Sequence, residues 1–302
     1  MTIKLERTSE DGRPRVDAKL CTVCGLCAAV CPSGTLRMGD DGVLVDPDTD
    51  FGCIACGQCM AICPSGAVTV SGRGLSVDDR LPLPAASEMA SDEQLGALLI
   101  RRRSRRHFDD REVPRAVLER VIELASTAPI GVPPSEVRLT VFHGRDKVRE
   151  FAADVVGITR RGMPTLRFMA GPLMRPLIGK AASEMFRTFV IPLAETITAE
   201  ADRGRDVLLY DAPAAILFSQ PAYGEADADI VATYAMLAAE SLGLGTCMIG
   251  SASPFLVRDK ALLAKYGLPA KPKLGLVLVM GYARYPKFHY GVRRSLADVN
   301  WV

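Results

Sequence analysis

A cysteine-rich stretch occurs twice in the first quarter of the chain: residues 21–34 read C-T-V-C-G-L-C-A-A-V-C-P-S-G, and residues 53–66 read C-I-A-C-G-Q-C-M-A-I-C-P-S-G. Nine of the fourteen positions are identical, at an offset of 32 residues. Two copies predict a small pseudo-symmetric domain, because a solenoid needs three or more repeats. The apolar residues of this domain are too few for a stable core, so we expect bound metal to supply folding free energy.

The spacing within each copy, C-x2-C-x2-C-x3-C-P, is the bacterial run that binds [4Fe–4S] clusters. Three closely spaced thiolates meet three irons of one cluster, and the fourth Cys completes the other cluster. We therefore expect two clusters, one bound by Cys21, Cys24, Cys27 and Cys63, and the other by Cys53, Cys56, Cys59 and Cys31. Zinc ribbons also contain C-x2-C pairs, but zinc gives no reason for the third Cys or for the Cys-Pro. Residues 15–70 resemble two-cluster ferredoxins.

Composition and charge exclude several classes of protein. The chain has 302 residues, is 48% hydrophobic and has a formal net charge of +2. These values argue against disorder and against a chain-wide basic field, so no nucleic-acid partner is predicted. No apolar run reaches the length of a membrane span, and the first residues lack the apolar core of a signal peptide. We expect a cytoplasmic protein in a reducing compartment.

The rest of the chain predicts a second, larger domain of the α+β class. Residues 1–72 are expected to form the ferredoxin-like domain, residues 73–91 a Gly- and Pro-containing linker, and residues 92–302 the second domain. One predicted helix begins at Ser91 or Asp92, and another begins at Pro114. Two more are predicted over 181–203, with a kink or break at Pro192, and over 226–242. Strands are predicted over 137–142, 213–218 and 274–280. This order favours a mixed sheet flanked by helices.

The segment R-R-R-S-R-R-H-F at residues 101–108 is the strongest signal in the second domain. Five Arg in six residues are either a solvated charge run or a phosphate site, since guanidinium groups bind phosphate bidentately. A site for single-stranded nucleic acid is not supported, because no aromatic residues are interleaved with the arginines for base stacking. His143 and Cys247 are expected to be structural. The Met and Phe side chains between 163 and 189 are expected to lie in the core or to form a lid.

Four motifs in this region resemble those of the FMN-dependent nitroreductase family. R-R-S-x-R-x-F ends at Phe108, A-P-I-G spans 128–131, L-G-L-G-T-C-M-I-G spans 242–250, and Gly281-Tyr282 opens the ending. The resemblance covers about residues 92–302. It implies an FMN cofactor and a homodimer with two sites across the subunit interface. The chain departs from the family at residues 132–136, which lack the usual Asn, and at Met248, where Trp is frequent.

The resemblance also implies roles for individual residues. By analogy, the FMN phosphate and ribityl chain would be bound by Arg102, Arg103, Ser104 and Arg106, with Arg294 as a late phosphate ligand and Arg293 as its competitor for that role. Pro129, Ile130 and Gly131 would lie against the flavin ring from the other subunit, and Ile249, Gly250 and Ser251 would line its N5 edge. No side chain is identified as a catalytic acid or base.

Together these features predict a flavin-dependent oxidoreductase. A low-potential donor such as a ferredoxin would reduce the clusters, which would pass electrons to FMN. The flavin would then reduce an electron-poor small molecule, such as a nitro compound, a quinone or an activated alkene. Two alternatives remain: an electron-transfer subunit that serves a partner protein, and a redox or flavin sensor without steady turnover.

Overall fold

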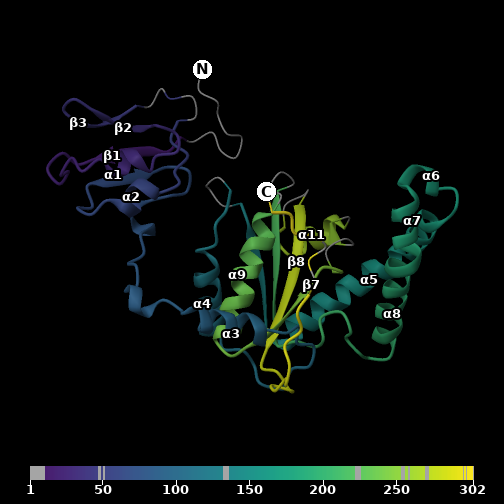
Figure 1. Cartoon of the computed structure of the whole chain (residues 1–302). Helices are drawn as coiled ribbons and strands as arrows, with labels where there is room; N and C mark the ends of the chain where they lie inside the picture. The colour runs from purple at the N-terminus through teal and green to yellow at the C-terminus, as the bar shows by residue number, and fades with distance from the viewer. Residues whose placement is uncertain are drawn as a thin grey trace. The chain divides into compact units, whose positions relative to one another are not determined.

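The computed structural model describes residues 11–46, 49, 52–131, 136–221, 226–252, 256–257, 259–268, 272–294, 296 and 298–301 (Figure 1). They form two compact units. One contains the described residues up to Met89 together with Ile130, Gly131 and Glu136, and the other contains residues 90–129 and those from Val137 onward. Each unit is described by itself below.

The first unit is built from two small antiparallel sheets and two short helices. Strand β1 (Arg13–Val16) pairs with β4 (Val68–Ser71), and β2 (Leu36–Gly39) pairs with β3 (Gly42–Val45). Helices α1 (Leu26–Ala29) and α2 (Gln58–Ile62) each follow a C-x2-C pair. The small core is made largely of the repeat itself: Cys27, Leu36, Ala55, Cys59, Met60, Val68 and Val70. Because cysteines supply part of this core, cofactor binding and folding are expected to be coupled.

The segment that follows β4 contains two 3-10 turns, η1 (Val77–Asp79) and η2 (Ala86–Glu88). Every residue from 78 to 95 is exposed. This exposure is typical of a linker, as predicted from the Gly and Pro content of residues 73–91.

The second unit is organised around a four-stranded sheet in the order β5-β6-β8-β7. Its strands are β5 (Arg138–His143), β6 (Ala214–Pro221), β8 (Pro272–Gly281) and β7 (Gly245–Ile249). All pairings between these named strands are antiparallel. The parallel component expected of a mixed sheet is limited, in the described residues, to a bridge between Ser104 and Thr246 at the β7 edge. That bridge attaches the arginine segment to the sheet.

Helices cover both faces of this sheet. Helix α9 (Asp227–Ser241) packs on β6, β7 and β8, and α4 (Arg115–Ala125) packs on α9 (Figure 1). The opposite face packs on the first half of α5 (Arg145–Ala170), and α11 (Lys260–Lys265) contributes Leu263 to the same core. Cys247 and Ile249 belong to that core, as do Val277 and Val279 of β8. The predicted helix-flanked α+β fold is confirmed.

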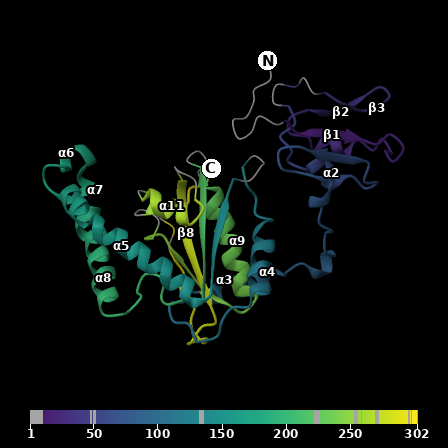
Figure 2. The same cartoon turned by 180° about the vertical axis from the view of Figure 1, so that it is seen from behind.

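The second half of α5 continues into a helical arm (Figure 2). The arm contains α6 (Arg175–Ile178), α7 (Lys180–Met185), the π-helical turn η3 (Phe186–Val190) and α8 (Ile191–Asp202). Pro192 is the second residue of α8, directly after the π-helical turn, so the helical segment is irregular where a kink or break was predicted, but it is not interrupted. Many large apolar side chains of the arm are exposed, including Phe168, Leu173, Leu177 and Phe189. Of the two alternatives expected for the Met and Phe side chains here, the core does not hold for Phe168 and Phe189, and a lid stays a prediction.

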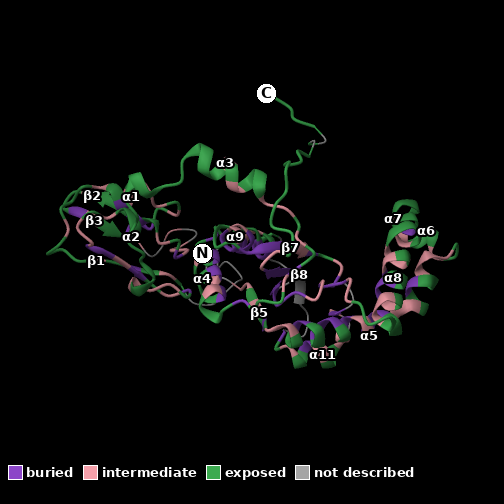
Figure 3. Ribbon diagram, turned by 90° about the horizontal axis from the view of Figure 1, so that it is seen from below, coloured by how far each residue is buried: buried purple, intermediate pink, exposed green. Residues whose placement is uncertain are grey.

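Helix α3 (Asp92–Arg101) delivers the chain to the sheet edge. The Ser91 hydroxyl accepts a hydrogen bond from the backbone N–H of Gln94, and the Gln94 side chain accepts one from the Ser91 N–H. This capping box is the start signal expected at Ser91. The helix is exposed along most of its length (Figure 3).

Candidate functional site

The two thiol loops of the first unit have nearly the same backbone. Gly25 and Gly57, at the N-caps of α1 and α2, have φ values of 75° and 73°. Val23 and Ala55 are also left-handed, with φ values of 54° and 53°. Successive backbone N–H groups in such turns form concavities that suit the sulfides of iron–sulfur clusters. The backbone of both loops therefore fits the predicted cofactor.

The cysteines interact in the two crossed sets expected from the spacing. Burial raises the pKa of the Cys27 thiol, and Cys63 and Cys21 raise it further. Burial also raises the pKa of Cys59, to about 12, with further contributions from Cys53, Cys56 and Cys31. Cys31 thus lies with the three cysteines of the second repeat, and Cys63 lies near Cys27 and Cys21 of the first.

The second set surrounds a single cavity. Cys31, Cys53, Cys56 and Cys59 all line it, together with Pro14, Leu36 and Val70. Among the described residues, no three His, Cys, Asp or Glu side chains form a group suited to one metal ion. Four thiolates around one space repel each other unless a cationic group lies between them. An iron–sulfur core with one Cys per iron supplies that charge, so the residues present fit a cluster.

The fourth cysteine of each repeat is held by its own Pro-Ser loop. The Cys31 sulfur lies 3.6 Å from the Ser33 hydroxyl and 3.4 Å from the backbone nitrogen of Leu36. The Cys63 sulfur lies 3.6 Å from the Ser65 hydroxyl. Burial raises the pKa of both thiols, but these hydrogen bonds outweigh it, and each pKa is lowered overall. The loops thus favour the thiolate form that binds iron.

The arginine segment of the second unit runs along β7. The Arg105 backbone N–H donates to the Thr246 carbonyl at 2.7 Å, next to the bridge between Ser104 and Thr246. Glu240 of α9 accepts hydrogen bonds from the Thr246 hydroxyl at 2.8 Å and from its backbone N–H at 3.2 Å. Thr246 is therefore held from both sides, which fixes the register of the arginine segment on the sheet.

Three of the predicted phosphate ligands lie near Cys247 and affect the pKa of its thiol. Burial raises the pKa of the Cys247 thiol, and the Arg106 guanidinium and the Ser104 hydroxyl oppose this rise. The positive charge of Arg102 also lowers the pKa of this thiol. Two guanidinium groups and one hydroxyl at the β7 edge form a donor set that suits a phosphate dianion. Cys247 itself is a buried core residue, as expected.

Arg105 of the same segment makes a different set of contacts. Arg105 donates to the carbonyls of Tyr285 at 2.6 Å and Pro286 at 3.2 Å, and its guanidinium lies 4.0 Å from the Phe288 ring centroid. Burial lowers the pKa of Arg105, and Arg101 and Arg103 lower it further by charge repulsion. The structure therefore places Arg103 close to Arg105. Arg105 in turn binds the segment that follows β8, residues 282–294, which is called the C-terminal strap below.

The other predicted flavin contacts lie in three places. Ile249 ends β7 on the same face as Cys247, and Gly250 and Ser251 follow it directly. Arg294 is exposed in the strap, three residues after Gly291, where an added Cβ would lie 2.6 Å from the Ile100 side chain. The exposed Pro129 follows α4 in the second unit, whereas Ile130 and Gly131 belong to the first unit. Residues 132–135, where the sequence departs from the family pattern, lie outside the described residues.

A loop that the sequence did not single out supports the arginine segment. Tyr210 has a left-handed backbone, with φ of 60°, and its ring lies 5.7 Å from the Arg106 guanidinium. The Asp206 carboxylate accepts hydrogen bonds from the backbone N–H groups of Leu208, Leu209 and Asp211, at 2.9 to 3.0 Å. Tyr210 and Asp211 stand before a predicted strand, but no motif marks them, because their role depends on contacts made across the fold.

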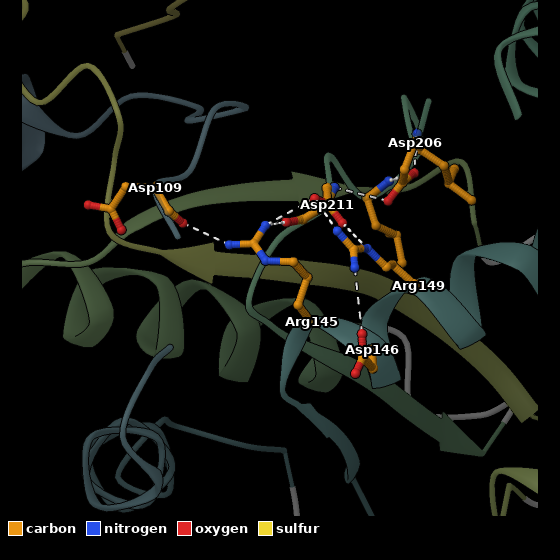
Figure 4. A network of polar contacts seen from close by, with 8 residues as sticks. Asp109, Arg145, Asp146, Arg149, Asp206 and Asp211 are labelled. Atoms are coloured by element: carbon orange, nitrogen blue, oxygen red, sulfur yellow. Dashed lines mark hydrogen bonds and ion pairs between the residues drawn. The ribbon is translucent and has the colours of Figure 1, made fainter. Parts of the chain in front are cut away.

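Two arginines of α5 complete this support (Figure 4). Arg149 binds the Asp211 carboxylate through two nitrogens, at 2.5 and 2.9 Å. Arg145 donates to the backbone carbonyl of Asp211 and to that of Asp109, the latter at 2.7 Å. Asp109 follows the arginine segment, so Arg145 ties that segment to the 206–211 loop. His143, as expected, is structural: its ring nitrogen lies 2.9 Å from the Val113 carbonyl oxygen.

Comparison with known proteins agrees with this arrangement. Residues 13–70 match the model of a 4Fe-4S dicluster domain, and residues 99–282 match that of the nitroreductase family. A search of curated proteins found no match for the chain. No helix among the described residues is both long and apolar enough to cross a membrane.

Two solved structures with bound FMN are similar to the chain, and the first of them supports the fold. A nitroreductase with bound FMN from Bacteroides fragilis is 19% identical, with a TM-score of 0.50, and the match covers 69% of this chain and 98% of that chain. Another, from Desulfitobacterium hafniense and also with bound FMN, is 19% identical with a TM-score of 0.49, covering 70% and 99%. With the family match over more than half of its length, the chain belongs to the nitroreductase family and carries a 4Fe-4S dicluster domain at residues 13–70.

Proposed function

We propose that this chain is an oxidoreductase that takes electrons from a low-potential donor through two [4Fe–4S] clusters to FMN, and from there to an electron-poor small molecule. The observation that carries the proposal is the presence, in one chain, of two crossed sets of four cysteines and of a family domain whose sheet edge presents Arg102, Ser104 and Arg106 together. Clusters beside a flavin domain serve electron transfer rather than structure alone.

The phosphate end of the cofactor is the best supported part of the proposed flavin site. Arg102 and Arg106 would supply charge-assisted hydrogen bonds and Ser104 a hydroxyl donor. The Tyr210 ring lies 5.7 Å from the Arg106 guanidinium, and Arg145 holds the backbone carbonyls of Asp109 and Asp211. A site whose donors are fixed before binding loses less side-chain entropy when the phosphate arrives.

The chain's own residues bind and orient, and the cofactors supply the redox chemistry. Bound FMN supplies hydride chemistry at N5, while bound clusters supply one-electron transfer. Ile249, Gly250 and Ser251, at the end of β7, would line the ring edge, and Arg294 would add a cation from the strap. In the partner subunit of a homodimer, Pro129, Ile130 and Gly131 would complete the site.

The donor and the acceptor follow from the same chemistry. Ferredoxins are one-electron donors of low potential, which suits delivery to iron–sulfur clusters. Nitro compounds, quinones and activated alkenes are acceptors for hydride from a reduced flavin. No described side chain is assigned the proton transfer, so solvent or a group of the helical arm would supply the proton.

Anaerobic purification of the full chain tests the cofactor content. We expect about eight iron, eight sulfide and one FMN per chain. Reduced ferredoxin should then bleach the flavin absorbance near its oxidised maximum, and adding a nitroaromatic or a quinone should restore it over many cycles. Reoxidation only by a partner protein would favour an electron-transfer subunit. Eight iron with no FMN, even after reconstitution, would contradict the proposed function.

A further inference from the structure

The two halves of the cysteine unit differ in charge at one pair of equivalent positions. At the repeat offset of 32 residues, Arg73 corresponds to Asp41. The loops themselves are nearly alike, because the N-cap residues Gly25 and Gly57 differ by only 2° in φ. The pseudo-symmetry of the two thiol loops is therefore broken by a charge rather than by the backbone.

The two side chains also differ in burial. Arg73 is only 4% exposed, whereas Asp41 is exposed to solvent. Arg73 has φ of 54° and lies between Gly72 at 88° and Gly74 at 74°, so three consecutive residues are left-handed. A residue with a Cβ rarely adopts this conformation, and it persists only where the surrounding structure holds it. Here the turn holds the Arg73 side chain inside the unit.

This turn lies against the second thiol loop. Gly72 and Leu75 form a bridge across it, and a Cβ added to Gly57 would lie 3.5 Å from the Leu75 side chain. Gly57 directly follows Cys56, and Leu75 packs against the small core that contains Cys59. Cys53 lines the cavity that Cys31, Cys56 and Cys59 share. One buried positive charge therefore lies beside one of the two cysteine sets.

A fixed positive charge stabilises the reduced form of a nearby cluster, because reduction adds a negative charge. The effect is large for a buried cation, since water and salt screen it weakly. Net charge near the cluster is one of the factors that set its reduction potential. An exposed carboxylate at the equivalent position, as at Asp41, acts through water and has a much smaller effect.

We propose that Arg73 makes the two clusters inequivalent by holding the one bound by Cys31, Cys53, Cys56 and Cys59 at the higher reduction potential. That cluster is then the first to accept an electron and the one that retains it. Each cluster takes one electron from the reductant, passing from the 2+ to the 1+ state with no bond made or broken. The inference rests on the proposed binding of two clusters, and it adds the order in which they are reduced.

The test is an anaerobic redox titration of the full chain with dithionite, followed by electron paramagnetic resonance. The wild-type chain should show two one-electron midpoints. Arg73→Gln should lower the equilibrium constant for reducing the higher-potential cluster by about tenfold or more. Each tenfold change lowers the midpoint potential of that cluster by about 59 mV. The lower midpoint should stay in place. Arg73→Lys should retain most of the separation. Arg15→Gln is the matched control, because Arg15 is an exposed arginine of the same unit.

Cysteine variants assign the two signals and keep the inference testable if Arg73→Gln does not load iron. Cys24 and Cys56 are equivalent positions, and both are exposed. Cys56→Ala should leave only the lower midpoint, and Cys24→Ala only the higher one; the reverse assignment overturns the inference. Two equal midpoints in a wild-type chain with eight iron overturn it while leaving the proposed function intact. A wild-type chain that binds no clusters overturns the proposed function first.

Discussion

The phosphate site at the β7 edge can be tested by the double substitution Arg102→Ala with Arg106→Ala. In the structure, both guanidinium groups and the Ser104 hydroxyl lower the pKa of the Cys247 thiol, so all three groups lie near that residue. A charge-assisted hydrogen bond contributes about 1.5–3 kcal/mol net, so losing one from each residue should cost about 3–6 kcal/mol of binding free energy. That corresponds to roughly 10²–10⁴-fold weaker FMN binding.

Flavin fluorescence measures this loss directly. FMN is added to the deflavinated chain, and the dissociation constant is compared between the wild type and the double variant, with riboflavin as a ligand that lacks the phosphate. The wild type should prefer FMN strongly, and the variant should bind the two ligands about equally. The control, Arg101→Ala with Arg115→Ala, removes the same charge from exposed positions and should retain the preference. Iron content should be unchanged in both.

Two results would refute the reasoning. If the double variant binds FMN with wild-type affinity, the phosphate does not lie at this edge. If FMN and riboflavin binding weaken equally, the arginines support the fold of the domain rather than the phosphate. Thermal unfolding of each variant separates the second result from a general loss of stability.

The remaining predictions concern the clusters, the supporting loop and one buried carboxyl group. Cys53→Ala should halve the iron content and prevent reduction of the flavin by ferredoxin, and unchanged ferredoxin-driven turnover would exclude the proposed electron route. Asp206→Ala should destabilise the fold by about 1–3 kcal/mol, because three backbone N–H groups lose their acceptor, while the exposed Asp146→Ala should have little effect in the same denaturant titration. Burial raises the pKa of Glu240, partly offset by hydrogen bonds from Thr246, so the folded chain binds this proton more tightly than the unfolded chain does. The stabilisation that proton binding at Glu240 gives the folded chain is therefore lost as pH rises from about 4.3 through the folded pKa. Over that range, the stability of the Glu240→Gln variant relative to wild type should increase. A difference that is flat with pH would contradict this sign.

Local signals along the chain were sufficient for most elements of the fold. The capping box at Ser91, Pro114 before α4 and the apolar run of β8 each act within a few residues, so sequence patterns report them directly. Helix α5 was not predicted as a single 26-residue element, because Pro164 lies inside it and interrupts the pattern. Its first half is held by packing on the sheet and α8, which a local pattern does not record.

The candidate site divides in the same way. The R-R-S-x-R-x-F motif identified Arg102, Ser104 and Arg106, but only the bridge to Thr246 explains why these three lie together while Arg105 binds the strap. Tyr210 could not be predicted, because it reaches Arg106 across more than one hundred residues through a left-handed turn. Roles given by resemblance to Arg103, Arg294 and the 129–131 segment stay predictions.

The cysteine spacing by itself determined the cofactor class and predicted the crossed assignment of the two sets, because iron ligation requires particular atoms at particular separations along a short loop. The sequence also determined the family, since its motifs lie in the order that the fold requires. Only the tertiary structure decided which charges are buried. Arg73 and Asp41 occupy equivalent places in the repeat, yet one lies inside the unit and the other in water. Burial depends on how distant segments pack, and it decides how strongly a charge acts on its neighbours.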